Sequence, residues 1–464
     1  MMLAPPLDPE FRPAALYSRE HRRLADEDPT AREVHFALVR PDGTVFREET
    51  RLLGERHARV ALSLRHAERW LKFLLWQKGA SRVLVAGAPD VVVYLKTHYG
   101  PTGPRAFDHA FMGDKVYGER LRIEAVATAA DLPAAAAKNL SLGRHLAGCR
   151  IGFDLGGSDR KAAAVIDGRV VFSEEVPWDP YFQTDPAYHL EGVHDSLLRA
   201  AAHLPRVDAI GGSAAGVYVN NEVRVASLFR GVAPADFERH VRRMFLTLQQ
   251  RWNGVPFEVT NDGEVTALAA SLSLGVNRVL GISMGTSLAA GYVTAEGSIT
   301  PWLNELAFAP IDLREDAPLD EWSGDGGCGV QYFSQQGVGR LAARAGFCFP
   351  KETGWAERLI HVQDELARGS IKAGEIFETV GICFGYAVAH YADFYDISHV
   401  LILGRVTSGM GAEIILDRAR AVLAIEFPEL ADRISFHTPN EQNKRHGQAV
   451  TAASLPALRS SLVD

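Results

Sequence analysis

Apolar residues recur along this chain in two patterns. Short apolar runs bounded by glycine, asparagine or aspartate predict strands, and longer stretches with apolar residues three or four positions apart predict helices. Strands are expected at 34–40, 44–52, 82–86, 149–155, 162–166, 169–176, 207–211, 256–260, 278–282, 288–293 and 401–403. Helices are expected at 55–77, 186–203, 234–248, 265–274, 338–345, 357–367, 371–394 and 412–424. This mixture predicts an α/β protein.

Length and charge narrow the class of protein. A chain of 464 residues exceeds one typical core, so two or three domains are expected. The 49 basic and 57 acidic residues give a net charge of −8 without a dominant basic run, which argues against a nucleic-acid binder. We expect no signal peptide and no membrane span. Four scattered cysteines form neither a disulfide framework nor a metal-ligand pattern, and this favours the cytoplasm.

The first 148 residues leave two interpretations open. Residues 1–30 read as a polar arm that is ordered only where it docks, and residues 100–120 read as irregular. The order of hairpin, helix and strand in 34–88 resembles that of 152–216, without a glycine turn. The region is therefore either a degenerate lobe that lacks a phosphate loop or an unrelated α/β extension.

A tight glycine turn with chemistry-bearing neighbours follows one apolar strand. Gly156 and Gly157 let backbone N–H groups face an anion without a Cβ in the way. Asp154, just before the turn, is placed to hold a divalent cation or its waters, and Ser158 and Lys161 to reach phosphate oxygens. The alternative is an ordinary β-hairpin whose glycines serve only the turn.

Two later turns repeat this pattern of small and hydroxyl residues after an apolar strand. They consist of Gly285, Thr286 and Ser287, and of Gly404, Ser408 and Gly409. A helix follows the last of them, and a helix that starts in such a loop is a site for phosphate or for the polar edge of a nucleotide. One glycine loop is a weak signal, whereas three in this order are a stronger one.

A fourth feature is a carboxylate at the boundary of a strand and a helix. The strand at 256–260 delivers Asn261 and Asp262 to the start of the helix at 265–274. Such a residue lies where loops meet a cleft. Both residue types are also favoured as helix N-caps, so a purely structural role is the alternative. Their position between two glycine turns favours a catalytic role for Asp262.

These motifs resemble the actin-like ATPase and sugar-kinase superfamily. Residues 154–161, 261–264, 285–287 and 404–409 are similar to its two phosphate motifs, catalytic aspartate motif and adenosine motif. Within it they most resemble the ROK (repressor, open reading frame, kinase) group, which includes bacterial glucokinases. The resemblance covers about 150–455. It implies a two-lobed actin-like, ribonuclease H-like fold with a five-stranded mixed sheet in each lobe, closing on ATP, Mg²⁺ and a sugar.

The resemblance also implies roles for single residues. Asp262 takes the proton from the sugar hydroxyl, Asn261 binds the sugar, and Asp154 acts on Mg²⁺ through water. Gly156, Gly157, Ser158 and Lys161 line one side of the phosphates, and Gly285, Thr286 and Ser287 the other. Gly404, Ser408 and Gly409 meet the adenosine. Phosphoryl transfer depends on such positioning and charge neutralisation more than on covalent chemistry.

The sequence departs from the ROK pattern around the sugar and zinc segments. Glu305 is retained as a sugar ligand, but Phe308 stands where a histidine would bind sugar and zinc. Only Cys328 remains of the cysteine cluster, and one thiol makes no tetrahedral site, so no structural zinc is expected. Gln331 replaces a sugar-binding glutamate. Because glutamine carries no charge, the acceptor need not be glucose.

Two functions follow from this resemblance. The first is an ATP-dependent carbohydrate kinase, and the second is a non-catalytic sugar- or nucleotide-sensing ROK-like protein. Three regions are expected: an N-terminal extension (1–148), a first lobe (149–275) and a second lobe with a C-terminal helix (276–464). The expected partner is a small-molecule sugar rather than nucleic acid or membrane, and a homodimer is left open.

Overall fold

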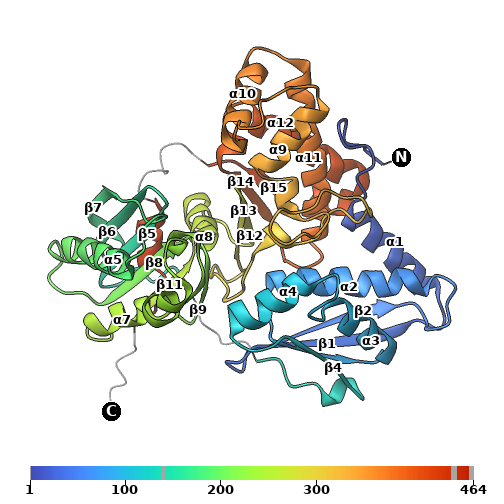
Figure 1. Cartoon of the computed structure of the whole chain (residues 1–464), viewed down its shortest axis with the longest axis horizontal. Coiled ribbons are helices and arrows are strands. Elements are labelled where there is room, and N and C mark those ends of the chain that lie inside the picture. Colours follow the sequence, from blue (N-terminus) through green and yellow to red (C-terminus); the bar gives the residue numbers. More distant parts are fainter. Residues whose placement is uncertain (1, 137–141, 440–446, 459–464) are drawn as a thin grey trace.

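The computed structural model describes residues 2–136, 142–439 and 447–458, which form three regions (Figure 1). We call them the N-terminal region (2–136), the first lobe (149–275) and the second lobe (276–439). They hold sheets of four, five and four strands, respectively. Each sheet is accompanied by helices, and the expected α/β class is confirmed.

The N-terminal region is built on an antiparallel hairpin, β1 (Arg32–Val39) and β2 (Val45–Leu52). Strand β3 (Arg82–Ala86) pairs antiparallel with β1, and β4 (Arg122–Val126) pairs parallel with β3. The helical elements are α1 (Ala14–Glu27), α2 (Val60–Gln77), α3 (Pro89–His98), α4 (Ala106–Ala110), the π-helical turn η1 (Phe111–Tyr117) and the 3-10 turn η2 (Ala129–Asp131).

The first lobe has the strand order β11-β8-β5-β6-β7. Its strands are β5 (Cys149–Leu155), β6 (Asp159–Ile166), β7 (Arg169–Pro177), β8 (Ala209–Ala214) and β11 (Phe257–Asn261). Strands β5, β8 and β11 are parallel, and β6 runs antiparallel to both of its neighbours. The remaining elements are α5 (Pro186–Ala201), the hairpin β9 (Val217–Val219) and β10 (Glu222–Val225), η3 (Ser227–Phe229), α6 (Pro234–Asp236), η4 (Phe237–Val241), α7 (Met244–Arg251) and α8 (Asp262–Leu274).

The second lobe has the strand order β13-β12-β14-β15. Its strands are β12 (Val279–Met284), β13 (Leu288–Val293), β14 (His399–Leu403) and β15 (Ser435–His437). Its helical elements are η5 (Leu306–Phe308), η6 (Gly329–Gln331), α9 (Gln335–Arg344), α10 (Trp355–Ala367), α11 (Ile371–Tyr391), η7 (Arg405–Thr407), α12 (Gly411–Glu426) and α13 (Pro428–Ala431).

The second sheet has one strand fewer than the resemblance implies. Its described strands number four rather than five. Next to β13, Ile299 makes only isolated bridges, to Val293 and to Leu142. The chain then turns away, because the backbone at 303–305 is bound by the end of α2 instead of by the sheet.

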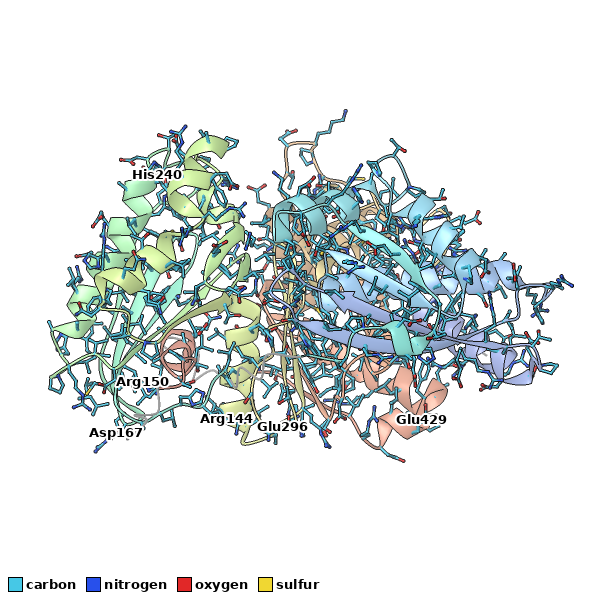
Figure 2. All side chains as sticks on the ribbon, turned by 90° about the horizontal axis from the view of Figure 1, so that it is seen from below. Arg144, Arg150, Asp167, His240, Glu296 and Glu429 are labelled. Atoms are coloured by element: carbon cyan, nitrogen blue, oxygen red, sulfur yellow. The ribbon has the colours of Figure 1, made fainter. Side chains whose placement is uncertain are left out.

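The C-terminal helix α14 (Gly447–Ala453) packs on the first lobe, although the sequence boundaries assign it to the second. A Cβ at Gly152 or Gly211 would lie 1.7 Å from the carbonyl oxygen of Ala449 or Ala452, so this packing requires glycine on β5 and β8. Arg150, beside α14 in Figure 2, donates to the carbonyl oxygen of Pro456 at 2.7 Å. Residues 440–446 of the expected terminal helix lie outside the described residues.

The N-terminal region and the second lobe share one hydrophobic core. A single cluster of buried side chains runs from Phe36 and Leu74 to Ile282 and Phe384. Within it, Phe73 of α2 stacks on Phe394, just beyond α11, with ring centroids 3.7 Å apart. The first lobe has a core of its own, around Ile151, Phe153 and Phe245. The N-terminal region is therefore part of the second lobe in packing terms.

The arm at 1–30 contains the helix α1, which is ordered where it packs against α11 (Figure 1). One expectation for the N-terminal region is wrong. The stretch 100–120 is not irregular, since it forms α4 and η1. Its aromatic residues are held by tertiary packing: the Phe111 and Trp76 rings lie 5.0 Å apart. Such packing overrides a glycine-rich local sequence.

The N-terminal sheet is mixed, as a degenerate lobe requires, but its strand order differs. Strand β3 lies directly beside β1, whereas in the first lobe β5 separates β8 from the β6–β7 hairpin. The N-terminal region thus lacks the equivalent of β5. Whether it derives from a lobe stays a prediction. Within the described residues no helix is both long and apolar enough to cross a membrane.

The shared core predicts that the N-terminal region and the second lobe unfold together. Phe73→Ala removes a fully buried ring and is expected to cost about 3–5 kcal/mol of unfolding free energy. Val93 on α3 is 67% exposed, so Val93→Ala is the control and should change stability by less than about 0.5 kcal/mol. Denaturant unfolding, followed by hydrogen exchange of peptides from both regions, measures this. Loss of protection in the N-terminal region alone would contradict a shared core.

Candidate functional site

The first glycine turn closes the β5–β6 hairpin at the carboxyl edge of the first-lobe sheet. Asp154 lies near the end of β5, is 5% exposed, and accepts a hydrogen bond from Ser213 Oγ of β8 at 2.7 Å. Lys161 Nζ lies 3.0 Å from Asp159 Oδ1 and 3.9 Å from Asp154 Oδ2. The charge of Lys161 is therefore already shared with two carboxylates. The turn itself consists of Gly156, Gly157 and Ser158.

Asp262 reaches the same edge through the parallel register of the sheet. Leu155, Ala214 and Asn261 lie side by side at the ends of β5, β8 and β11, and Asp262 follows Asn261 as the first residue of α8. Asn261 is the N-cap: its Oδ1 accepts from the backbone N–H of Gly263 at 2.7 Å. Its Nδ2 donates to the carbonyl oxygen of Gly216 at 2.8 Å. Asn261 is thus the N-cap, and the Asp262 carboxyl group is also hydrogen-bonded by the backbone at the start of α8.

The start of α8 is also where the two lobes touch. A Cβ at Gly263 would lie 2.5 Å from the carbonyl oxygen of Ala290, and one at Gly291 would lie 2.2 Å from that of Gly263. Ala290 and Gly291 belong to β13, whose first residue follows the turn at Gly285, Thr286 and Ser287. At about 3.3 Å per strand residue, this turn lies roughly 10 Å along β13 from the contact. Asp262 and the second turn therefore face the same junction.

The third turn adjoins the second. Ser283 of β12 lies beside Leu403 of β14 in parallel register, and a Cβ at Gly404 would lie 2.5 Å from the carbonyl oxygen of Met284. Gly409 has a φ of +63°, and a Cβ added to it would meet no atom within 4 Å. Ser408 is exposed. The structure thus brings the turns at 285 and 404 together at one edge of the second-lobe sheet.

Glu305 is held next to these residues by a rigid backbone segment. The preceding residue Asn304 has a φ of +49°, and its Oδ1 accepts a hydrogen bond from Tyr395 Oη at 2.7 Å. Its Nδ2 donates to Glu264 Oε1 on α8. Glu264 in turn accepts from the backbone N–H of Tyr292 on β13 at 3.2 Å. These bonds tie Glu305 to the beginning of α8.

Four carboxyl groups at this junction have raised pKa values, those of Asp154, Asp262, Glu264 and Glu305. Burial raises the pKa of Asp154 to about 6, against the hydrogen bond from Ser213, and the charge of Asp262 raises it further. Burial and then the charge of Asp262 raise the pKa of Glu305 to about 7. Burial also raises the pKa of Asp262 itself. Asp262 thus raises the pKa of both Asp154 and Glu305, in keeping with the strand register and the lobe contact that bring Asp262 to this junction.

This donor set fits a divalent cation and a polyphosphate. A buried carboxylate with a raised pKa is stabilised by a hard cation, and oxygen donors such as those of Asp154 and Ser213 suit Mg²⁺. The open turns at 285–287 and 408–409 present hydroxyl groups and backbone to an anion. Magnesium would be held at Asp154 and phosphates at the turns.

No model of a protein family matches the sequence, and no curated protein matches it. Among solved structures, a ROK hexokinase from Thermus thermophilus matches with a TM-score of 0.53 at 18% sequence identity. The match covers 66% of this chain and 97% of the hexokinase. The chain has the fold of a ROK hexokinase. The expected two-lobed fold is thereby confirmed, and so is the resemblance at the level of fold.

Other ROK structures match with lower scores. A ROK family glucokinase from Streptomyces griseus, in complex with glucose and AMPPNP, has a TM-score of 0.48 at 22% identity, covering 67% of this chain and 99% of its own. A ROK family transcriptional regulator, a homolog of the E. coli MLC protein, has a TM-score of 0.49 at 19% identity, covering 67% and 78%. Kinases and a regulator thus both occur among the neighbours.

The residues that depart from the ROK pattern lie in packed surroundings. Phe308 is buried, and its ring lies 4.2 Å from that of Trp76. Gln331 is also buried, and its Nε2 donates to Gln336 Oε1 on α9 at 2.8 Å. No contact joins Gln331 to Asp262 or Glu305 among the interactions of the described residues. Its role as a sugar ligand stays a prediction.

The zinc expectation also stays a prediction. Cys328 is fully buried, and its Sγ lies 3.8 Å from the carbonyl oxygen of Asp325. Burial raises the pKa of this thiol to about 12, so it is not a ready thiolate ligand. In the part of the chain that the structure describes, no three His, Cys, Asp or Glu side chains are grouped to hold a metal.

Sequence reasoning missed an arginine beside the first turn. The Arg230 guanidinium lies 4.1 Å from the ring centroid of Tyr181 and 5.1 Å from that of Phe182. The Tyr181 hydroxyl lies against Gly157, where a Cβ would approach it to 2.1 Å. Among the described residues no carboxylate pairs with Arg230. No motif marks this residue, because its partners come from a distant loop.

A cavity of about 370 Å³ lies elsewhere, between α1, β2, α2 and the end of α11. Its walls carry ion pairs: Arg22 with Asp393 at 2.8 Å and Arg51 with Asp26 at 3.4 Å. These paired charges neutralise one another, and the predicted chemistry lies at the lobe junction instead.

The raised pKa of Glu264 predicts a pH-dependent stability. Burial raises it from the usual 4.5 to about 8, against the hydrogen bonds from Asn304 and Tyr292. Between these pH values the folded state binds the proton more tightly than the unfolded state, so stability falls as the pH rises from 4.5 to 8.

Residue 264 cannot titrate in Glu264→Gln. Over this pH range the unfolding free energy of the variant should therefore fall by about 2–4 kcal/mol less than that of the parent protein. Urea unfolding at pH 5 and pH 8 measures the difference. Glu296→Gln, at an exposed turn residue (labelled in Figure 2), is the control. If the unfolding free energies of the parent protein and Glu264→Gln change equally with pH, the pKa of Glu264 is not raised.

Proposed function

We propose that this protein is a ROK family member that transfers a phosphoryl group from ATP to a hydroxyl of a sugar. The observation that carries the proposal is geometric: parallel register places Asp154 and Asp262 at one edge of the first-lobe sheet, and the contact of Gly263 with Gly291 sets that edge against the second lobe. The fold shared with a ROK hexokinase supports it. The expected partner is a small-molecule sugar, and cytoplasmic location and a homodimer remain expectations.

Asp262 is the proposed general base. Its carboxyl group stands at the start of α8, where Asn261 is the N-cap. Burial raises its pKa, which makes it a stronger base than an exposed aspartate. Glu305, whose pKa is raised to about 7 by burial and by Asp262, would bind the sugar hydroxyls beside it.

The glycine turns are proposed to hold ATP. Gly156, Gly157 and Ser158 face it from the first lobe, and Gly285, Thr286, Ser287, Gly404, Ser408 and Gly409 face it from the second. Magnesium, held at Asp154 through water, neutralises phosphate charge when bound. Closure of the two lobes would exclude water, the competing acceptor.

A second candidate function is sugar or nucleotide sensing without catalysis. The amide of Asn261 is bonded on both sides within the protein, and Gln331 is engaged with α9. Two of the three predicted sugar ligands are therefore already bonded within the protein. A sensor would bind a ligand at the same junction but transfer no phosphate.

Asp262→Asn tests the kinase proposal. It removes the base while preserving size and hydrogen bonding, and the rate of ADP release with the best sugar of a panel should fall about 10²–10⁴-fold. Nucleotide affinity, measured by calorimetry, should stay the same. Asp167→Asn is the matched control, because Asp167 lies at the opposite end of β6 with a φ of +46°, which asparagine tolerates.

The two candidate functions predict different behaviour of the parent protein. Sugar-dependent ADP release that Asp262→Asn abolishes and Asp167→Asn retains supports the kinase. Sugar binding without turnover across the panel supports the sensor. Absence of both sugar and nucleotide binding contradicts both proposals.

Arg230 gives a further prediction for the nucleotide side. Its guanidinium carries no ion pair among the described residues and lies beside the first turn, so we expect it to attract the phosphates. Arg230→Gln should raise the KM for ATP about 10-fold, the loss of one charge-assisted hydrogen bond, and leave the sugar KM unchanged. Arg230→Lys retains the charge and should show a smaller effect. An unchanged ATP KM in Arg230→Gln would place this residue outside the phosphate site.

A further inference from the structure

We infer that the N-terminal region positions the acceptor site, because the end of α2 holds the segment that carries Glu305. This inference rests on the proposed function for its chemistry, since Glu305 is the proposed sugar ligand. Trp76, at the end of α2, is the central positioning residue. Three kinds of interaction support this inference: backbone hydrogen bonds, an aromatic contact and a buried ion network.

The backbone hydrogen bonds join the last carbonyl groups of α2 to the Glu305 segment. The N–H groups of Leu303 and Asn304 donate to the carbonyl oxygen of Gln77 at 2.9 and 3.0 Å. The N–H group of Glu305 donates to the carbonyl oxygen of Trp76 at 3.0 Å. A helix end leaves such carbonyls without partners inside the helix, and they carry partial negative charge. The position of the Glu305 backbone is thus set by α2.

The aromatic contact fixes the same segment on its other side. Phe308, three residues after Glu305, packs on the Trp76 ring at 4.2 Å. The Trp76 ring is itself fixed, because its Nε1 donates to Asp108 Oδ1 at 2.8 Å. Trp76 has no exposed surface. Any shift of this ring would therefore move Phe308 or leave a cavity.

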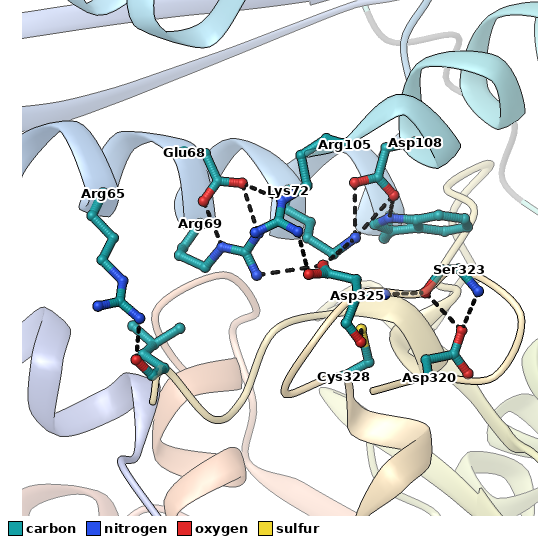
Figure 3. A network of polar contacts seen from close by, with 12 residues as sticks. Arg65, Glu68, Arg69, Lys72, Arg105, Asp108, Asp320, Ser323, Asp325 and Cys328 are labelled. Atoms are coloured by element: carbon teal, nitrogen blue, oxygen red, sulfur yellow. Dashed lines mark hydrogen bonds and ion pairs between the residues drawn. The ribbon is translucent and has the colours of Figure 1, made fainter. Parts of the chain in front are cut away.

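The ion network anchors α2 against a second loop of the second lobe (Figure 3). Lys72 Nζ lies 2.8 Å from Asp108 Oδ2 and 2.9 Å from Asp325 Oδ2. Arg69 lies 3.4 Å from Asp325 and 2.7 Å from Glu68, and Arg105 pairs with both of these acids. Burial opposes the charge of Asp325, but the charges of Lys72, Arg69 and Arg105 lower its pKa.

This network makes the docking of α2 specific rather than merely apolar. A buried charge that loses its partner is strongly unfavourable, so the helix cannot slide along the loop without a large cost. The register between Gln77 and Leu303 is therefore fixed. In consequence, the N-terminal region determines where the Glu305 carboxylate stands relative to Asp262.

Trp76→Leu tests the inference, with Phe36→Leu as the matched control. Both residues are fully buried aromatics of the N-terminal region, but Phe36 packs on Trp70 rather than on Phe308. Trp76→Phe, which retains a ring against Phe308, is the rescue variant. Each is made in the full-length protein, and all three are expected to fold with reduced stability.

The first readout is native-state hydrogen exchange of the amides of residues 303–305, which requires no enzymatic activity. Trp76→Leu should exchange about 10-fold or more faster there than the parent protein, while Phe36→Leu and Trp76→Phe should lie within about 2-fold of it. Peptides from 149–214 serve as an internal reference. Equal exchange at 303–305 in Trp76→Leu and Phe36→Leu would overturn the inference.

The second readout separates positioning from general damage. With the best acceptor of the sugar panel, the sugar KM should rise about 10-fold in Trp76→Leu, with an ATP KM within about 2-fold of the parent value. A parallel rise of both would overturn the inference. If the parent protein phosphorylates no sugar, the proposed function fails on its own experiment, and hydrogen exchange still decides whether Trp76 positions the segment.

Discussion

The contact between Gly263 and Gly291 determines the arrangement of the site. At these two positions the backbone of α8 lies directly on the backbone of β13, with no space for a side chain on either. Because α8 begins at the edge of the first-lobe sheet, this contact fixes Asp262 against the second lobe. A side chain at either glycine would separate the lobes and move the carboxylate away from the second turn.

Around this contact, the two sheets supply the chemical groups by register. Parallel pairing of β5, β8 and β11 places Asp154 and Asp262 at one edge, and parallel pairing of β12 and β14 places the turns at 285 and 404 at another. The raised pKa values of Asp154 and Glu305 follow from burying acids close to Asp262. Burial disfavours the charged forms of these acids, and a bound cation would stabilise them.

The N-terminal region changes the picture of a two-lobed protein. It shares a core with the second lobe, and α2 contacts the segment next to the site. The ROK hexokinase match covers 66% of this chain and 97% of the hexokinase. Through α2 the N-terminal region holds the segment 303–305, which does not pair with β13.

Local patterns predicted much of the fold, and long-range contacts account for what they missed. The β5–β6 turn and the strand before Asp262 are defined by residues close in sequence, and both were predicted correctly. The helices at 106–117 depend on Trp76, which lies far away in the chain, so no local pattern indicated them. For the same reason the sequence did not show that α14 returns to β5, or that Arg230 meets Tyr181. Gln331 was interpreted by its place in a motif, whereas its contacts depend on α9.

The central claim is that Asp154, Asp262, Glu305 and the glycine turns form one site between the lobes. Crystals grown with Mn²⁺ and a non-hydrolysable ATP analogue test it most directly, because manganese gives an anomalous signal. The account predicts a manganese peak beside Asp154, with the triphosphate between the turns at 156–158 and 285–287. A triphosphate bound elsewhere, with no manganese at Asp154 and no space beside the Asp262 carboxylate, would contradict it.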